Sequence, residues 1–123
     1  MSKLATAARL LMGTAFVVFG LNGFLHFLPD PGLPERARTV ITSFVQTGYL
    51  MQVVKATEVV GGALLLTGIA VPLALVLLAP IVVNIFLFHL MLAPEGLGPA
   101  VVLGACELVL ARAHWSRFRG LFA

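Results

Sequence analysis

Charged side chains are scarce in this sequence. Asp, Glu, Lys and Arg make up 11% of its 123 residues, against roughly 25% in a typical soluble domain, while hydrophobic residues make up 60%. This balance excludes an ordinary soluble domain and predicts an integral membrane protein whose surroundings are a lipid bilayer. The formal net charge is +3, but the basic residues form neither a groove nor a patch interleaved with aromatic residues, so we expect no nucleic-acid partner.

Cysteine is almost absent as well. The single residue, Cys106, excludes an internal disulfide and a Cys-x-x-Cys dithiol within the chain. It also excludes a metal site built from several thiolates of one chain, and we expect no metal site.

Long apolar runs dominate what is present. About 20 apolar residues cross the roughly 30 Å of bilayer hydrocarbon, and the sequence holds four runs of that order. No small-x-small cleavage pattern follows the first run, so we expect it to be an uncleaved transmembrane helix. The fold class is therefore predicted to be all-α, a four-transmembrane-helix bundle forming a single membrane domain over residues 1–123. The predicted spanning helices cover about 4–28, 50–67, 72–92 and 100–114.

Prolines separate the first two spans. Pro29, Pro31 and Pro34 must break the helix, because each lacks a backbone donor and has a fixed φ. A short amphipathic helix is predicted over about 35–47, with its apolar side chains on one side. This helix is expected either to lie in the membrane interface or to fold back as a re-entrant segment over the bundle.

The basic residues predict the orientation. In a four-span topology most of them fall on the side that holds both termini, whereas Arg36 and Arg38 fall on the other side, beside Asp30, Glu35 and Glu95. We therefore expect a multi-pass protein of the plasma (inner) membrane with both termini cytoplasmic. The basic residues of the terminal side are Lys3, Arg9, Arg112, Arg117 and Arg119.

Polar residues within the spans gather at one level. At about 1.5 Å rise per residue, Glu58 and Asn84 lie slightly to the outer side of the bilayer midplane, and Glu107 lies close to the level of Glu58. Ionisable residues inside a membrane span are by default candidates for a functional site. The predicted catalytic residues are Glu58 and His26, and the predicted ligand-binding residues are Asn22, Lys55, Asn84, His89 and Glu107.

Structural roles remain open for the same residues. Asn22 and Asn84 also suit interhelical hydrogen bonds, and Glu58 also suits a purely structural pair with Lys55 three residues earlier. Asn84 and His89 lie five residues apart, about 140° around a helix, so we expect that they do not both point squarely into one pocket.

The order of these motifs resembles the DoxX-like family of small four-helix membrane proteins. The resemblance rests on FGLNGFLHFLP from Phe19, TGYL from Thr47, EVVGGALLLTG from Glu58 and VPLALVLLAPIVVNIFLFH from Val71. Its motif positions here are Asn22, His26, Glu58, Gly62, Asn84 and His89.

The resemblance implies a membrane oxidoreductase subunit associated with quinone, since some members are linked to quinone-coupled oxidation of thiosulfate. Distant relatives resemble assembly factors, which keeps a non-catalytic membrane partner as the alternative. Because this chain lacks a redox pair of cysteines, electron transfer requires a bound cofactor, with quinone the candidate, or a redox partner subunit.

Two further interpretations and the oligomeric state stay open. A small proton-coupled exporter fits the size, the four spans and the membrane acid Glu58. A b-type haem fits His26 and His89 as axial ligands on diagonally opposed helices. The glycine-rich spans suit packing within one chain or across a homodimer.

Overall fold

The computed structural model describes residues 2–122, and every regular element within that range is helical. Helices α1, α3 and α4, together with the stretch Pro94–Ala113, are each long and apolar enough to cross a membrane. The predicted all-α fold with four candidate membrane-spanning helices is confirmed. In chain order the elements are α1 (Lys3–Leu25), α2 (Glu35–Gln46), α3 (Leu50–Thr67), α4 (Val71–Met91), the 3-10 turn η1 (Pro94–Gly96), α5 (Leu97–Ala113), α6 (Trp115–Phe118) and η2 (Arg119–Phe122).

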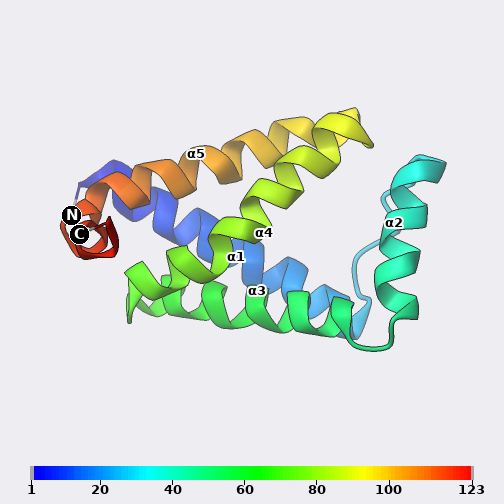
Figure 1. Ribbon diagram of the computed structural model, residues 1–123, viewed down its shortest axis with the longest axis horizontal. Coiled ribbons are helices and arrows are strands. Elements are labelled where there is room, and N and C mark those ends of the chain that lie inside the picture. Colours follow the sequence, from blue (N-terminus) through cyan, green and yellow to red (C-terminus); the bar gives the residue numbers. More distant parts are fainter. Residues whose placement is uncertain (1, 123) are drawn as a thin grey trace.

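The four long helices contact one another in a closed ring. Helix α1 packs on α3 and α5, and α4 packs on the same two helices, so α1 and α4 lie diagonally across the bundle. The start of α1 and the end of α5 lie together at one end of the molecule, which we call the terminal end (Figure 1). Helix α2 lies at the opposite end, where it contacts α3; this is the α2 end.

Helix α1 ends earlier than the sequence predicts. Instead of reaching residue 28 it stops at Leu25, and His26 adopts a left-handed conformation with φ of 52°. The Asn22 side chain supplies a reason, because its Oδ1 accepts a hydrogen bond from the Leu28 backbone N–H at 2.8 Å. This bond replaces the one that the Leu28 N–H would donate to a backbone carbonyl oxygen in a continuing helix. The prolines that follow hold the chain outside the helix.

Helix α5 begins earlier than predicted, at Leu97 rather than at residue 100. The predicted spans 72–92 and 100–114 leave residues 93–99 outside any helix. Pro99 lies in the first turn of α5, where a backbone N–H has no partner within the helix, so it does not interrupt the helix. Only Pro94–Gly96 forms the 3-10 turn.

Glycines allow α1 and α3 to approach closely. A Cβ added to Gly62 would lie 2.8 Å from the Val17 backbone nitrogen and 2.9 Å from the Gly13 carbonyl oxygen. Both neighbours are backbone atoms, which do not rotate away. The absence of side chains at Gly13 and Gly62 therefore allows the axes of α1 and α3 to lie close together.

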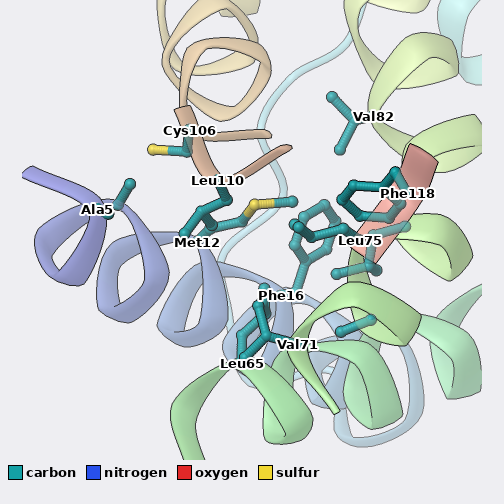
Figure 2. Packing of buried hydrophobic residues seen from close by; sticks show 13 residues of the cluster. Ala5, Met12, Phe16, Leu65, Val71, Leu75, Val82, Cys106, Leu110 and Phe118 are labelled. Atoms are coloured by element: carbon teal, nitrogen blue, oxygen red, sulfur yellow. The ribbon is translucent and has the colours of Figure 1, made fainter. Parts of the chain in front are cut away.

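The apolar core fills the terminal half of the bundle (Figure 2). Its largest fully buried side chains come from the first part of α1, the end of α3, the start of α4 and the end of α5. These side chains are Met12, Phe16, Leu65, Leu75, Leu78 and Leu110. Because the core is concentrated there, the α2 half of the bundle is the part left to hold polar groups.

Many large apolar side chains lie on the outside of the helices. Leu73 is 53% exposed, Val83 58% and Leu108 72%. A soluble monomer rarely exposes a continuous apolar surface of this extent, because each Å² of it costs about 25 cal/mol in water. The exposed apolar surface therefore fits a bilayer around the bundle.

Candidate functional site

A cavity of about 670 Å³ opens at the α2 end, and we call it the α2-end cavity. All five α-helices from α1 to α5 contribute to its lining, as does the proline-rich segment after α1. The volume lies within the roughly 300–1,000 Å³ typical of small-molecule sites. Six of the seven predicted site residues line it, namely Asn22, His26, Lys55, Glu58, Asn84 and His89.

An ion pair forms the most buried polar feature of this cavity. Lys55 Nζ lies 3.3 Å from Glu58 Oε1, one turn along α3. The Glu58 residue is only 4% exposed, so its charge is largely removed from solvent. A buried carboxylate requires such a partner, because an unpaired one is strongly destabilising. The i, i+3 contact considered from the sequence is present. It uses Glu58 Oε1, and Oε2 makes no hydrogen bond within residues 2–122.

Two glycines of α1 make room for Lys55. A Cβ on Gly23 would collide with the aliphatic part of the Lys55 side chain, and one on Gly20 would lie 3.0 Å from the Lys55 carbonyl oxygen. The lysine stem therefore lies against α1 while its ammonium group points to Glu58. The ion pair is oriented by the α1–α3 contact as well as by α3 itself.

Asn22 and His26 occupy the end of α1. The Asn22 amide binds the backbone of its own segment, at Leu28, rather than a neighbouring helix, so the interhelical link considered from the sequence does not form. His26 is exposed, and its backbone N–H donates to the Asn22 carbonyl oxygen at 2.8 Å. The local cap thus positions the His26 ring at the cavity rim.

Asn84 and His89 both line the cavity from α4, although their spacing indicated different directions. The cavity is wide enough to reach around this end of the helix. His89 Nδ1 lies 3.2 Å from the Ala93 carbonyl oxygen, which only accepts, so Nδ1 carries the proton in this hydrogen bond. A neutral His89 then keeps Nε2 as an acceptor. The Asn84 amide makes no hydrogen bond within residues 2–122, so its groups remain available.

The remaining predicted site residue, Glu107, does not line this cavity. It lies on α5 one turn beyond Leu103, which does line it, and Glu107 Oε1 is buried without a partner in the part of the chain that the structure describes. The adjacent Cys106 is buried in the apolar core. The structure therefore separates the two membrane acids, and only Glu58 reaches the cavity.

A second ion pair at the cavity was not predicted from the sequence. Arg38 of α2 lies 3.1 Å from Asp30 Oδ1, and both residues line the cavity. The hydrogen bond from Arg38 lowers the pKa of Asp30, and the Gly32 backbone N–H and the Arg38 charge lower it further. Eight residues and two prolines separate the pair, so neither helical nor strand periodicity signals the contact. Its geometric effect is to hold α2 against the segment that follows α1.

Aromatic and aliphatic side chains complete the lining. Phe16 and Phe19 come from α1, and Ile85 and Phe88 come from α4. The Phe88 ring meets the His89 ring edge to face, with 5.3 Å between centroids. Within residues 2–122 no group of three or more His, Cys, Asp or Glu side chains is arranged to hold a metal ion. The cavity is thus an apolar site with a few convergent polar groups.

Comparisons with known proteins add no assignment. No family model, no curated protein and no solved structure matches this chain.

Proposed function

We propose that this chain is a multi-pass membrane protein of the DoxX-like type that binds a quinone head group in the α2-end cavity, as a subunit of a membrane oxidoreductase. The observation that carries the proposal is the composition of this one cavity. It combines a buried Lys55–Glu58 pair, a histidine with a free ring nitrogen and several aromatic rings. A planar conjugated ring with two carbonyl oxygens, which becomes aromatic on two-electron reduction, is complementary to such a site.

The cavity residues fit the head group in three ways. The Lys55 ammonium and the Asn84 amide are donors suited to carbonyl oxygens. Phe16, Phe19 and Phe88 offer ring faces and edges to an aromatic ring. The apolar side chains that the helices expose to the bilayer provide a surface for an isoprenoid tail.

A bound quinone supplies the two-electron, two-proton redox chemistry that the chain's own side chains lack. Glu58 and His89 are the groups of this cavity that hold or release a proton, and His26 is a third at its rim. Lys55 keeps Glu58 in place through their ion pair. Removing the Glu58 carboxylate while keeping its shape therefore tests the site directly.

The experiment is quinone binding to detergent-purified protein, measured by extraction and by titration with a soluble short-chain quinone. Glu58→Gln is expected to weaken binding by about tenfold, because it removes the charge-assisted hydrogen bond that orients the Lys55 ammonium toward the cavity, and such a bond contributes roughly 1.5–3 kcal/mol. Glu107→Gln is the matched control. It removes the other membrane acid, which lies on α5 outside the cavity. Unchanged binding in Glu58→Gln, or equal loss in both variants, contradicts the proposal.

A non-catalytic partner subunit is the second candidate, and the placement of α2 favours it. This helix lies outside the ring of long helices and leaves Ile41 37% and Val45 54% exposed. An exposed apolar stripe on a projecting helix suits a surface that binds another membrane protein. A preparation without quinone that co-purifies with one membrane protein, and loses it on Val45→Asp, supports this candidate over the first.

A further inference from the structure

A second cavity, of about 520 Å³, lies at the terminal end of the bundle, remote from the α2-end cavity. Its polar lining consists of Thr6 and Arg9 from α1 and of His114 and Arg117 from the segment after α5. The turn between α3 and α4 closes it through Gly68 and Ala70. We call it the terminal-end cavity.

The charged side chains that line this cavity are all positive. Two guanidinium groups line it, whereas none of the chain's five acidic side chains does. Arg9 uses Nη1 to donate to the carbonyl oxygens of Leu65 and Leu66, which lie in the last turn of α3. Its Nη2 and Nε groups make no hydrogen bond within residues 2–122, and neither does the side chain of Arg117. Several cationic donors therefore remain unpaired around one space.

Two further groups border the same space. His114 Nε2 is buried and has no partner among the described residues. The N-terminus of α4 also borders the cavity, and its N-cap residue, Ala70, offers no side-chain cap. The first helical hydrogen bond is donated by Ala74 to the Ala70 carbonyl oxygen, which leaves the earlier amides of α4 without a partner in the helix. Such a helix start favours an anion.

We propose that the terminal-end cavity binds the phosphate of an anionic phospholipid head group, held by Arg9 and Arg117. Guanidinium forks match the geometry of phosphate oxygens. The residues that line the cavity lie at the ends of the membrane-spanning helices, where phospholipid phosphates lie, and Trp115, which follows His114 in the sequence, suits the membrane interface. At about 30 Å³ per water, 520 Å³ corresponds to roughly 17 waters, so a whole head group fits the space better than a bare phosphate ion.

The chain's single tryptophan provides the assay. Trp115 is 50% exposed and lies next to His114 and two residues before Arg117. The full-length protein is reconstituted in phosphatidylcholine, and brominated phosphatidylglycerol or brominated phosphatidylcholine is added as a quencher. With two arginines each contributing about 1 kcal/mol, quenching should favour the anionic lipid by about tenfold or more. Equal quenching by the two lipids overturns the proposal.

Matched variants separate a site from diffuse surface charge. Arg117→Gln should lower the preference for phosphatidylglycerol about fivefold. Arg112→Gln and Arg119→Gln remove neighbouring exposed charges that do not line the cavity and should leave the preference unchanged. An equal loss in all arginine variants overturns the proposal. Unchanged elution on size exclusion establishes that each variant is folded.

Inorganic phosphate distinguishes the two sources of the same chemistry. Phosphate is titrated against sodium chloride of equal ionic strength while quenching by phosphatidylglycerol is followed. Equal effects of the two salts support the lipid as the ligand. Displacement by phosphate beyond that by chloride overturns the lipid assignment, because it identifies a free phosphate as the better ligand.

Discussion

Lys55 Nζ lies 3.3 Å from Glu58 Oε1, yet the two side chains differ in exposure, at 24% and 5%. Both residues line the α2-end cavity, and the lysine is the more accessible of the two. In this arrangement Lys55 is the one charged partner of Glu58 among the described residues. The pair is therefore the point at which the stability of the bundle and the chemistry of the cavity are coupled.

Lys55→Met tests that coupling. It leaves Glu58 buried without its partner, so we expect the free energy of unfolding to fall by about 1 to 3 kcal/mol at neutral pH. The double variant Lys55→Met/Glu58→Gln should recover most of the loss, because no uncompensated charge remains. Unfolding in mixed micelles with increasing SDS measures both. A double variant no more stable than Lys55→Met shows that the lysine contributes through packing on α1 rather than through its charge.

Gly62→Ala tests the contact between α1 and α3. The new methyl group would lie 2.8 Å from the Val17 backbone nitrogen, so the helices must separate, and a loss of about 1–3 kcal/mol is expected. Gly104→Ala is the control, because nothing lies within 4 Å of that Cβ and the change should raise helix stability by about 0.5–1 kcal/mol. The same SDS titration measures both variants. Equal behaviour of the two variants contradicts the close approach.

The general architecture was predictable because it depends on properties that single segments carry. Apolar runs of sufficient length identify the spans, and counting residues along each span places Glu58 and Asn84 at one depth. The structure places both in one cavity with His89. Depth along a helix follows from sequence number, so groups at one depth lie close where their helices also turn them toward the same space.

Details that depend on contacts between segments were not predictable. The early end of α1 requires the Asn22 side chain to accept the Leu28 N–H, and no propensity indicates that choice. The Asp30–Arg38 pair requires the prolines to turn the chain back on itself. The absence of Glu107 from the cavity depends on the rotation of α5 about its own axis, which depth alone does not define.

Cysteine labelling tests the proposed orientation. Ser43 of α2 and Ser116 near the end of the chain are both exposed and lie at opposite ends of the bundle. In a Cys106→Ala background, Ser43→Cys should react with a membrane-impermeant maleimide added to intact cells. Ser116→Cys should react only after the cells are permeabilised, because the basic residues of the terminal end favour the cytoplasmic side. The reverse labelling pattern contradicts the proposed orientation.

Acid should release α2 from the segment that follows α1. Hydrogen bonds from Arg38 and Gly32 lower the pKa of Asp30 below its ordinary value of 3.8. A group with a depressed pKa in the folded state stabilises the fold above its unfolded pKa, and this contribution is lost as the pH falls through the folded pKa. The Asp30–Arg38 pair should therefore be intact at neutral pH and lost below pH 3.8.

A nitroxide on Ser43→Cys, in the Cys106→Ala background, reports this release as increased mobility of α2. Asp30→Asn lacks the carboxylate, so its label should be mobile at every pH, without a transition in the acid range. A label on Thr14→Cys of α1 is the control, because that exposed position makes no contact with Asp30 or Arg38 and should show no acid transition. If the α2 label mobilises in acid equally in Asp30→Asn, another group controls α2. Since Arg38, Ile41 and Val45 line the α2-end cavity, loosening α2 also widens its entrance, and quinone binding should weaken over the same pH range.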